Sequence, residues 1–109
     1  MTTKPKPIAI AYPGRVLRHL RALGHHLNPV LAVGKEGVTA ALAAETERAL
    51  LAHELVKVRV HQEAPAERHE VAAELASATT ATLVQVLGRT ILLYKRHPNE
   101  PKISWPKAR

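Results

Sequence analysis

The chain has 109 residues, which is enough for one compact domain and too few for a two-domain enzyme. Hydrophobic residues make up 46% of it but aromatic residues only 3%, so the predicted core is aliphatic. Sixteen lysines and arginines against nine acidic residues give a formal net charge of +7, which favours a polyanionic partner such as nucleic acid or an anionic surface. Cysteine is absent, which excludes disulfide bonds and thiolate metal sites.

Charge is unevenly distributed along the chain. Residues 1–26 contain five basic residues and no acid, residues 27–94 contain six basic and eight acidic residues, and residues 95–109 contain five basic residues and one acid. Both ends are therefore cationic, although basic ends can also serve solubility alone. The apolar run 8–11 is far shorter than the roughly 20 residues of a membrane span, so we expect a cytoplasmic protein without a membrane partner.

The N-terminal third predicts an irregular arm followed by an amphipathic helix. Residues 1–13 contain three prolines and no helical or strand period. Apolar residues then recur at helical spacing and predict a helix over residues 15–27. Its apolar arc consists of Val16, Leu17, Leu20, Leu23 and Leu27. Its outer arc is basic and consists of Arg15, Arg18, His19, Arg21, His25 and His26.

The middle of the chain predicts two strands and a helix. A short strand over residues 30–33 stops at residues 34–37, and a second helix runs from Thr39 to about residue 53, with Leu42, Ala49 and Leu50 on its buried side. Residues 55–61 alternate between valine and basic residues, so we expect a core face and a positive stripe that contains Lys57, Arg59 and His61.

The last part predicts a helix, a hairpin and a tail. Pro65 is expected in the first turn of the third helix. Its outward residues are predicted to be Glu67, Glu70 and Glu74, and its inward residues Val71, Ala72, Leu75 and Ala78. Runs 82–87 and 90–94 form a hairpin around Gly88 and Arg89, and residues from 97 onward form a basic, extended tail.

These elements predict an α/β fold. The order helix, strand, helix, strand, helix, strand, strand implies two right-handed crossovers followed by a hairpin, and hence a two-layer domain with a mixed four-stranded sheet. We expect an arm over residues 1–13, a domain over residues 14–96 and a tail over residues 97–109.

The loop over residues 34–37 has the pattern Gly-x-x-Gly between a strand and a helix. Backbone N–H groups and the helix dipole favour anions at such a place, and Lys35 adds a positive charge. A tight turn without a ligand is the alternative interpretation. The loop lacks the Lys-Ser/Thr ending of a P-loop, so nucleotide hydrolysis has no support.

No catalytic or metal-binding pattern emerges from the titratable residues. The seven histidines match no known zinc-ligand spacing, aspartate is absent, and Ser77 and Ser104 lie in no nucleophile motif. We therefore expect no metal site, no cofactor and no enzymatic activity.

Four blocks of sequence resemble a known RNA-binding family. They are LRALGHHLNPV at residues 20–30, VGKEGVT at 33–39, HELVKV at 53–58 and VQVLGRTILLYK at 84–95. In order and separation these blocks resemble the CRM (chloroplast RNA splicing and ribosome maturation) domain, in its single-domain bacterial form, the YhbY family. The resemblance covers roughly residues 14–105.

The resemblance implies a fold related to the C-terminal domain of translation initiation factor three, with strand order 1-2-4-3. It also implies RNA binding through the Gly-x-x-Gly loop and the neighbouring basic surface. The residues expected to contact RNA are Gly34, Lys35, Glu36, Gly37, Arg15, Arg18, Arg21, His25, Lys57, Arg59, Arg89, Lys95 and Arg96. Glu36 departs from the expected loop charge, because it places an acid beside Lys35.

From this resemblance we expect a monomer that binds ribosomal RNA, or precursors of the large ribosomal subunit, during ribosome assembly. Phosphate contacts should dominate, because the chain offers few aromatic residues for stacking on bases. The alternative is a protein-interaction adaptor that docks on ribosomal proteins or assembly factors through the acidic third helix. A small hydrolase or metal-dependent enzyme is disfavoured by the missing aspartate and cysteine.

Overall fold

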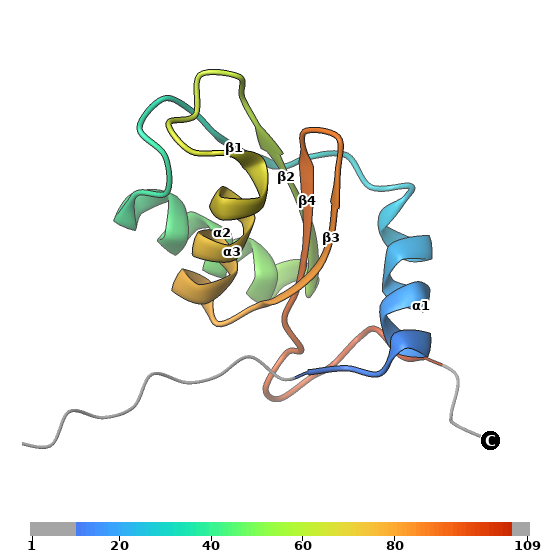
Figure 1. Ribbon diagram of the computed structural model, residues 1–109. Helices are drawn as coiled ribbons and strands as arrows, with labels where there is room; N and C mark the ends of the chain where they lie inside the picture. The colour runs from blue at the N-terminus through green and yellow to red at the C-terminus, as the bar shows by residue number, and fades with distance from the viewer. Residues whose placement is uncertain (1–10, 106–109) are drawn as a thin grey trace, which may run out of the picture.

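The computed structural model describes residues 11–105, which form three helices and one four-stranded sheet (Figure 1). In chain order the elements are α1 (Gly14–Gly24), β1 (Leu31–Val33), α2 (Ala40–His53), β2 (Leu55–Val60), α3 (Arg68–Thr79), β3 (Thr82–Leu87) and β4 (Thr90–Tyr94). The predicted α/β class and element order are confirmed. Within residues 11–105 no helix is long and apolar enough to span a bilayer.

The strands lie in the order β1-β2-β4-β3, as the family resemblance implied. β1 is parallel to β2, whereas β4 is antiparallel to both β2 and β3. The hairpin turns at Gly88 and Arg89, and Gly88 has a φ of 56°, a conformation that glycine adopts without a steric penalty. The last strand is therefore inserted between the second and third strands.

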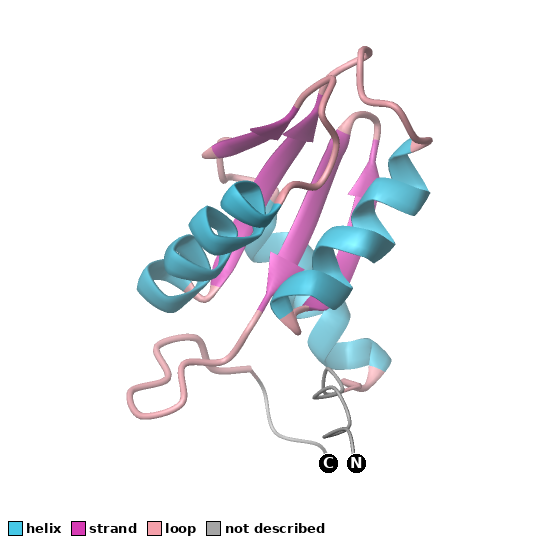
Figure 2. Ribbon diagram, turned by 90° about the vertical axis from the view of Figure 1, so that its left-hand side faces the viewer, coloured by secondary structure: helices cyan, strands magenta, loops and turns pink. Residues whose placement is uncertain are grey.

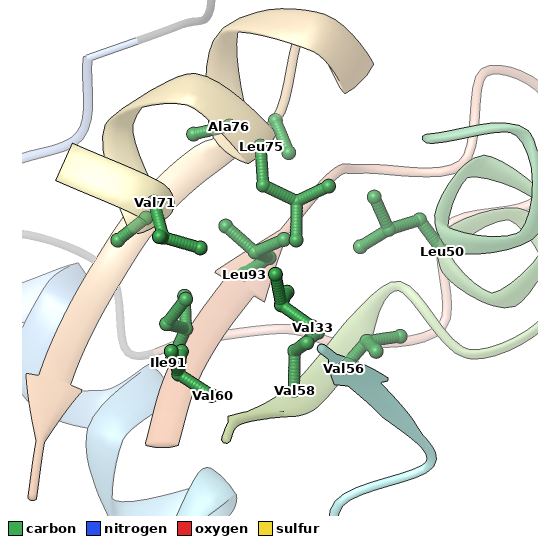
Figure 3. Packing of buried hydrophobic residues seen from close by; sticks show 12 residues of the cluster. Val33, Leu50, Val56, Val58, Val60, Val71, Leu75, Ala76, Ile91 and Leu93 are labelled. Carbon is green, nitrogen blue, oxygen red and sulfur yellow. The ribbon is translucent and has the colours of Figure 1, made fainter. Parts of the chain in front are cut away.

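One face of the sheet is covered by α2 and α3. Val56, Val58 and Val60 alternate along β2 and point to this side, where they meet Leu50 of α2 and Leu75 of α3 (Figure 3). Thr39 begins α2 as predicted, since its hydroxyl accepts a hydrogen bond from the N–H of Leu42 at 3.1 Å. This face supplies the larger of the two apolar clusters.

The opposite face, called the α1 face below, is covered in part by α1. Figure 1 shows α1 on one side of the sheet and α2 and α3 on the other, and Figure 2 shows helices before and behind the strands. A second buried cluster lies beneath α1 and consists of Val16, Leu20, Leu55, Val84, Leu92 and Tyr94. The domain therefore has three layers, not the expected two, because the central strands carry apolar residues on both faces.

α1 is shorter than predicted and leaves part of its apolar arc uncovered. The helix ends at Gly24, which packs against Leu92 of β4, instead of continuing to Leu27. Leu23 and Leu27 remain 39% and 37% exposed. Helical period placed both leucines on the apolar arc but could not show where the helix ends or how far the sheet covers it.

α3 begins three residues later than predicted. Glu67 is its N-cap and accepts a hydrogen bond from the N–H of His69 at 2.9 Å. Pro65 precedes the helix and lies beside Gly37, so the first-turn interpretation of this proline is wrong. The inward set is also corrected: Ala76 and Thr79 are buried, whereas Ala78 is exposed.

Residues 97–105, called the strap below, lack helix and strand, as predicted for the tail, yet they pack against the domain. The carboxylate of Glu54, at the α2–β2 junction, accepts hydrogen bonds from the N–H groups of His97 (2.8 Å), Lys102 (2.7 Å) and Ile103 (2.8 Å). Glu54 is 1% exposed. Burial alone would raise its pKa, but the three backbone donors outweigh burial and lower it.

The three aromatic residues of the chain form one cluster at the start of α1. Tyr12 lies edge-on to Tyr94 and to Trp105, with ring centroids 5.5 and 5.3 Å apart. Tyr94 is fully buried, and burial raises its pKa to about 12. This cluster joins the strap to α1. Because Tyr94 is buried within it, the ring of Tyr94 is not accessible to a ligand.

Glu54→Gln should lower the free energy of unfolding by about 2 kcal/mol, because the strap loses charge-assisted hydrogen bonds. The native pKa of Glu54 is lowered, so its contribution is complete above an unfolded pKa of about 4.3 and is lost as the pH falls through the native value. Urea unfolding at several pH values tests both effects. The exposed Glu45→Gln on α2 is the control, and equal stabilities of the two variants would contradict this account.

Gly24→Ala should destabilise the domain by about 1–3 kcal/mol, although alanine usually favours a helix over glycine. A Cβ at this position would overlap the Leu92 side chain, with Cδ1 only 2.8 Å away. A Cβ at Gly14 would meet only Arg18 Nη1, at 3.7 Å, so Gly14→Ala is the matched control. Thermal melts in which both variants equal or exceed the parent would refute the tight contact between α1 and β4.

Candidate nucleic-acid interface

Five of the nine acidic residues lie on the α2 and α3 side of the sheet, whereas Glu36, Glu63 and Glu100 lie outside the helices and strands. None of the nine acidic residues lies on α1 or within a strand. Five lie on α2, on α3 or at the N-cap of α3, namely Glu45, Glu47, Glu67, Glu70 and Glu74. Glu54 is buried and bonded to the strap. Glu67, Glu70 and Glu74 are exposed, which confirms their predicted outward orientation.

The outer face of α1 carries uncompensated positive charge. Arg15 and Arg18 are exposed, Arg21 is half-buried, and His25 caps the C-terminus of the helix. Within residues 11–105 the ion pairs all involve Glu67, on the far side of the sheet. The α1 arginines therefore have no carboxylate partner in the described chain.

Two further cations lie on the α1 face of β2. Lys57 pairs in register with Leu92, and Arg59 with Thr90, so both side chains share the side of the sheet that α1 covers in part. Lys57 is half-buried and Arg59 is exposed. The predicted positive stripe is shorter than expected, because β2 ends at Val60 and His61 follows the strand. Leu55, on the same face, is buried in the α1 cluster. On this face, the side chain at the start of β2 is buried in the core and the side chains toward its end are cationic.

The loop over residues 34–37 makes a tight turn between β1 and α2. The N–H of Gly37 donates to the carbonyl of Gly34 at 3.0 Å, and Gly37 has a φ of 71°. A Cβ at Gly34 would meet open space. Lys35 and Glu36 are both exposed at the tip. The loop thus offers an accessible backbone and two opposite charges, while Gly37 is required by the turn itself.

The structure brings the loop over residues 34–37 and Arg89 to one end of the sheet, whereas α1 begins near the opposite end, where Tyr12 contacts Tyr94 of β4. The carbonyl of Arg89 accepts a hydrogen bond from Val60 at 2.7 Å, which places the hairpin at the end of the sheet where the loop over residues 34–37 follows β1. Lys95 and Arg96 follow β4 at the opposite end. Lys95 Nζ donates to the carbonyl of Thr79 at 2.8 Å, so its charge stabilises the C-terminus of α3.

Within the part of the chain that the structure describes, no three histidine or glutamate side chains are grouped as metal ligands. His25 and His26 contact each other edge to edge, with ring centroids 5.5 Å apart. The candidate site therefore consists of cationic side chains and the exposed backbone of the loop over residues 34–37.

Comparison with known families decides the assignment of the chain. Residues 13–95 match the family model described as the CRS1/YhbY (CRM) domain. The chain belongs to this family. The resemblance drawn from the four sequence blocks is thereby confirmed.

Several known proteins align with most of the chain of this CRM-domain protein. It is 39% identical over 93 residues to "Probable RNA-binding protein YqeI" of Bacillus subtilis, covering 85% of this chain and 97% of that protein. It is also 39% identical over 88 residues to a Haemophilus influenzae protein named "RNA-binding protein", covering 81% and 88% of the two chains. The solution structure of SAV1595 from Staphylococcus aureus superposes with a TM-score of 0.75 at 32% identity, covering 88% of this chain and all of that one.

Gly37→Ala should destabilise the CRM domain by about 1–2 kcal/mol, because an L-residue is strained at positive φ and its Cβ would lie 3.2 Å from Pro65 Cγ. Gly34→Ala, where the added Cβ meets nothing within 4 Å, should melt like the parent. Differential scanning calorimetry of both variants checks the contrast. Equal melting temperatures would show that the positive φ of Gly37 imposes no constraint.

Proposed function

We propose that this protein binds RNA through its α1 side. The surface comprises the basic arc of α1, Lys57 and Arg59 of β2, the loop over residues 34–37 and Arg89. The observation that carries the proposal is that α1 and the strands contain no acid and that the α1 arginines have no carboxylate partner within residues 11–105. Polyanions are attracted to such a surface over a distance of several ångströms. The names of the relatives as RNA-binding proteins support the same class of partner.

Phosphate contacts should supply most of the affinity. Tyr94 is fully buried, while Tyr12 and Trp105 are half-buried in contact with each other, so the described chain presents no open aromatic platform for stacked bases. Arginine and lysine bind phosphates largely without regard to sequence, and each contact releases counterions. Binding should therefore weaken steeply with salt.

We further propose that the RNA is ribosomal, or a precursor of the large ribosomal subunit, and that the protein acts in the cytoplasm as a monomeric, non-enzymatic assembly factor. The support is the family to which residues 13–95 belong together with the single-domain architecture. Crosslinking the protein to RNA in cells and sequencing the bound fragments tests this directly. Enrichment of large-subunit precursor is expected, whereas recovery of messenger RNA alone would contradict it.

The acidic side of the domain favours a second candidate function. Glu70 and Glu74 are exposed on α3, away from the proposed RNA surface, and they offer a separate contact for a basic ribosomal protein or assembly factor. An adaptor of this kind would bind particles only when the protein partner is present. Binding to protein-free RNA separates the two functions.

Replacing Arg15, Arg18 and Arg21 together by glutamine should reduce the log–log salt slope of RNA binding by about two units, at 0.7–0.9 per lost phosphate contact. The melting temperature should change little, because these side chains form no ion pair in the described structure. Filter binding at several salt concentrations measures the slope. Arg48→Gln, at an exposed position on α2, is the control on the acidic side. An unchanged slope for the triple variant would show that this arc is only solvated.

A further inference from the structure

An apolar groove of about 480 Å³ lies beside the proposed phosphate surface. Its walls come from the end of α1 and the connection to β1, from the end of α2 and the start of β2, and from the strap. The side chains that matter here are Leu23, Leu27, Val30, Leu55, Lys57 and Ile103. The volume falls within the ~300–1,000 Å³ typical of ligand pockets.

Apolar side chains that normally belong to a core are exposed in this groove. Leu23, Leu27 and Val30 are 39%, 37% and 58% exposed. Leu23 lies in the last turn of α1, which ends at Gly24 against Leu92 of β4, and Leu27 follows the helix. Contiguous exposed apolar surface of this kind marks a contact with a ligand or a partner.

The charge around the groove is positive. Lys57 forms part of its wall, and Arg59 follows on the same face of β2. The neighbouring acid, Glu54, is buried and already accepts three backbone hydrogen bonds. An apolar floor with a cationic edge is complementary to a nucleotide, whose base is largely apolar on its faces and whose phosphate is anionic.

We propose that this groove receives one or two unpaired bases of the bound RNA, with the phosphates of the same segment on Lys57 and Arg59. The inference rests on the proposed RNA binding and specifies its substrate as RNA that contains single-stranded nucleotides. Unpaired bases can be splayed away from the strand and held against protein side chains, whereas bases in a duplex cannot. Aliphatic side chains replace the aromatic platform, because the tyrosines and the tryptophan pack on one another.

Base contacts and phosphate contacts respond differently to salt. Burial of a base against leucine and valine releases no counterions, so its loss weakens binding equally at every salt concentration. Loss of an arginine contact instead changes the salt slope. The groove and the α1 arginines can therefore be distinguished by the same titration.

The test compares Leu23→Ala/Leu27→Ala with Leu51→Ala/Leu87→Ala, which removes the same atoms from two leucines that are 55% and 59% exposed outside the groove. Affinity is measured for a 12-nucleotide single strand of mixed sequence, for the matching duplex and for an abasic strand of equal length. The groove pair should lose roughly five- to twentyfold in affinity for the single strand, with an unchanged salt slope. Its affinities for the duplex and the abasic strand should match those of the parent.

Val30→Ser is a second groove variant, and it leaves α1 untouched. It should also weaken binding of the single strand, and it keeps the test valid if the leucine pair lowers the melting temperature. Parent-like binding of the single strand by all groove variants would overturn the inference and leave the proposed function standing. An equal loss for single strand, duplex and abasic strand would overturn it as well, in favour of a general effect on the surface. Failure of the parent protein to bind any of the three RNAs would overturn the proposed function and this inference together.

Discussion

A single helix has to cover one face of a four-stranded sheet, and this constraint determines the functional side of the molecule. Strands lie about 4.8 Å apart and a helix with its side chains is about 10 Å wide, so one helix covers roughly two strands. Two helices, α2 and α3, cover the opposite face (Figure 2). On the α1 face the 11-residue helix packs over β4 and its neighbours, and the side near β1 is left open.

The open part of that face combines features that a core would not tolerate. Arg59 is exposed there and Lys57 is half-buried, beside the exposed apolar side chains of Leu27 and Val30. The strap closes one edge of this region through Ile103, held in place by the carboxylate of Glu54. Lys57 lines the groove and Arg59 follows it on the same face of β2, so the proposed phosphate and base contacts lie next to each other, and the strands and the helix of this face carry no acid.

Features with local causes could be predicted from the sequence. Thr39 begins α2, and both hairpin strands have the predicted bounds, because an N-cap and a two-residue turn are determined by neighbouring residues. The role of Glu54 could not be predicted, since its hydrogen-bond donors lie 43 to 49 residues further along the chain. Helical period placed Leu27 on the apolar arc but could not show that α1 ends before it.

The candidate site also contains features that could be predicted from the sequence and features that could not. The charge of α1 and the Gly-x-x-Gly loop could be predicted as patterns, whereas the hydrogen bond from Lys95 to the C-terminus of α3 could not. That contact joins residues 16 positions apart and depends on how β4 enters the sheet. The groove was equally unpredictable, because three stretches of chain far apart in the sequence form its walls.

The proposed RNA surface lies on the α1 side of the sheet. Titration of the ¹⁵N-labelled protein with a single-stranded RNA, followed by amide chemical shifts, tests it at every backbone position that carries an N–H. The account predicts the largest shifts in α1, in the loop over residues 34–37 and at residues 57–59, with α3 nearly unchanged. Shifts confined to α3, or spread evenly over both sides of the sheet, would contradict it.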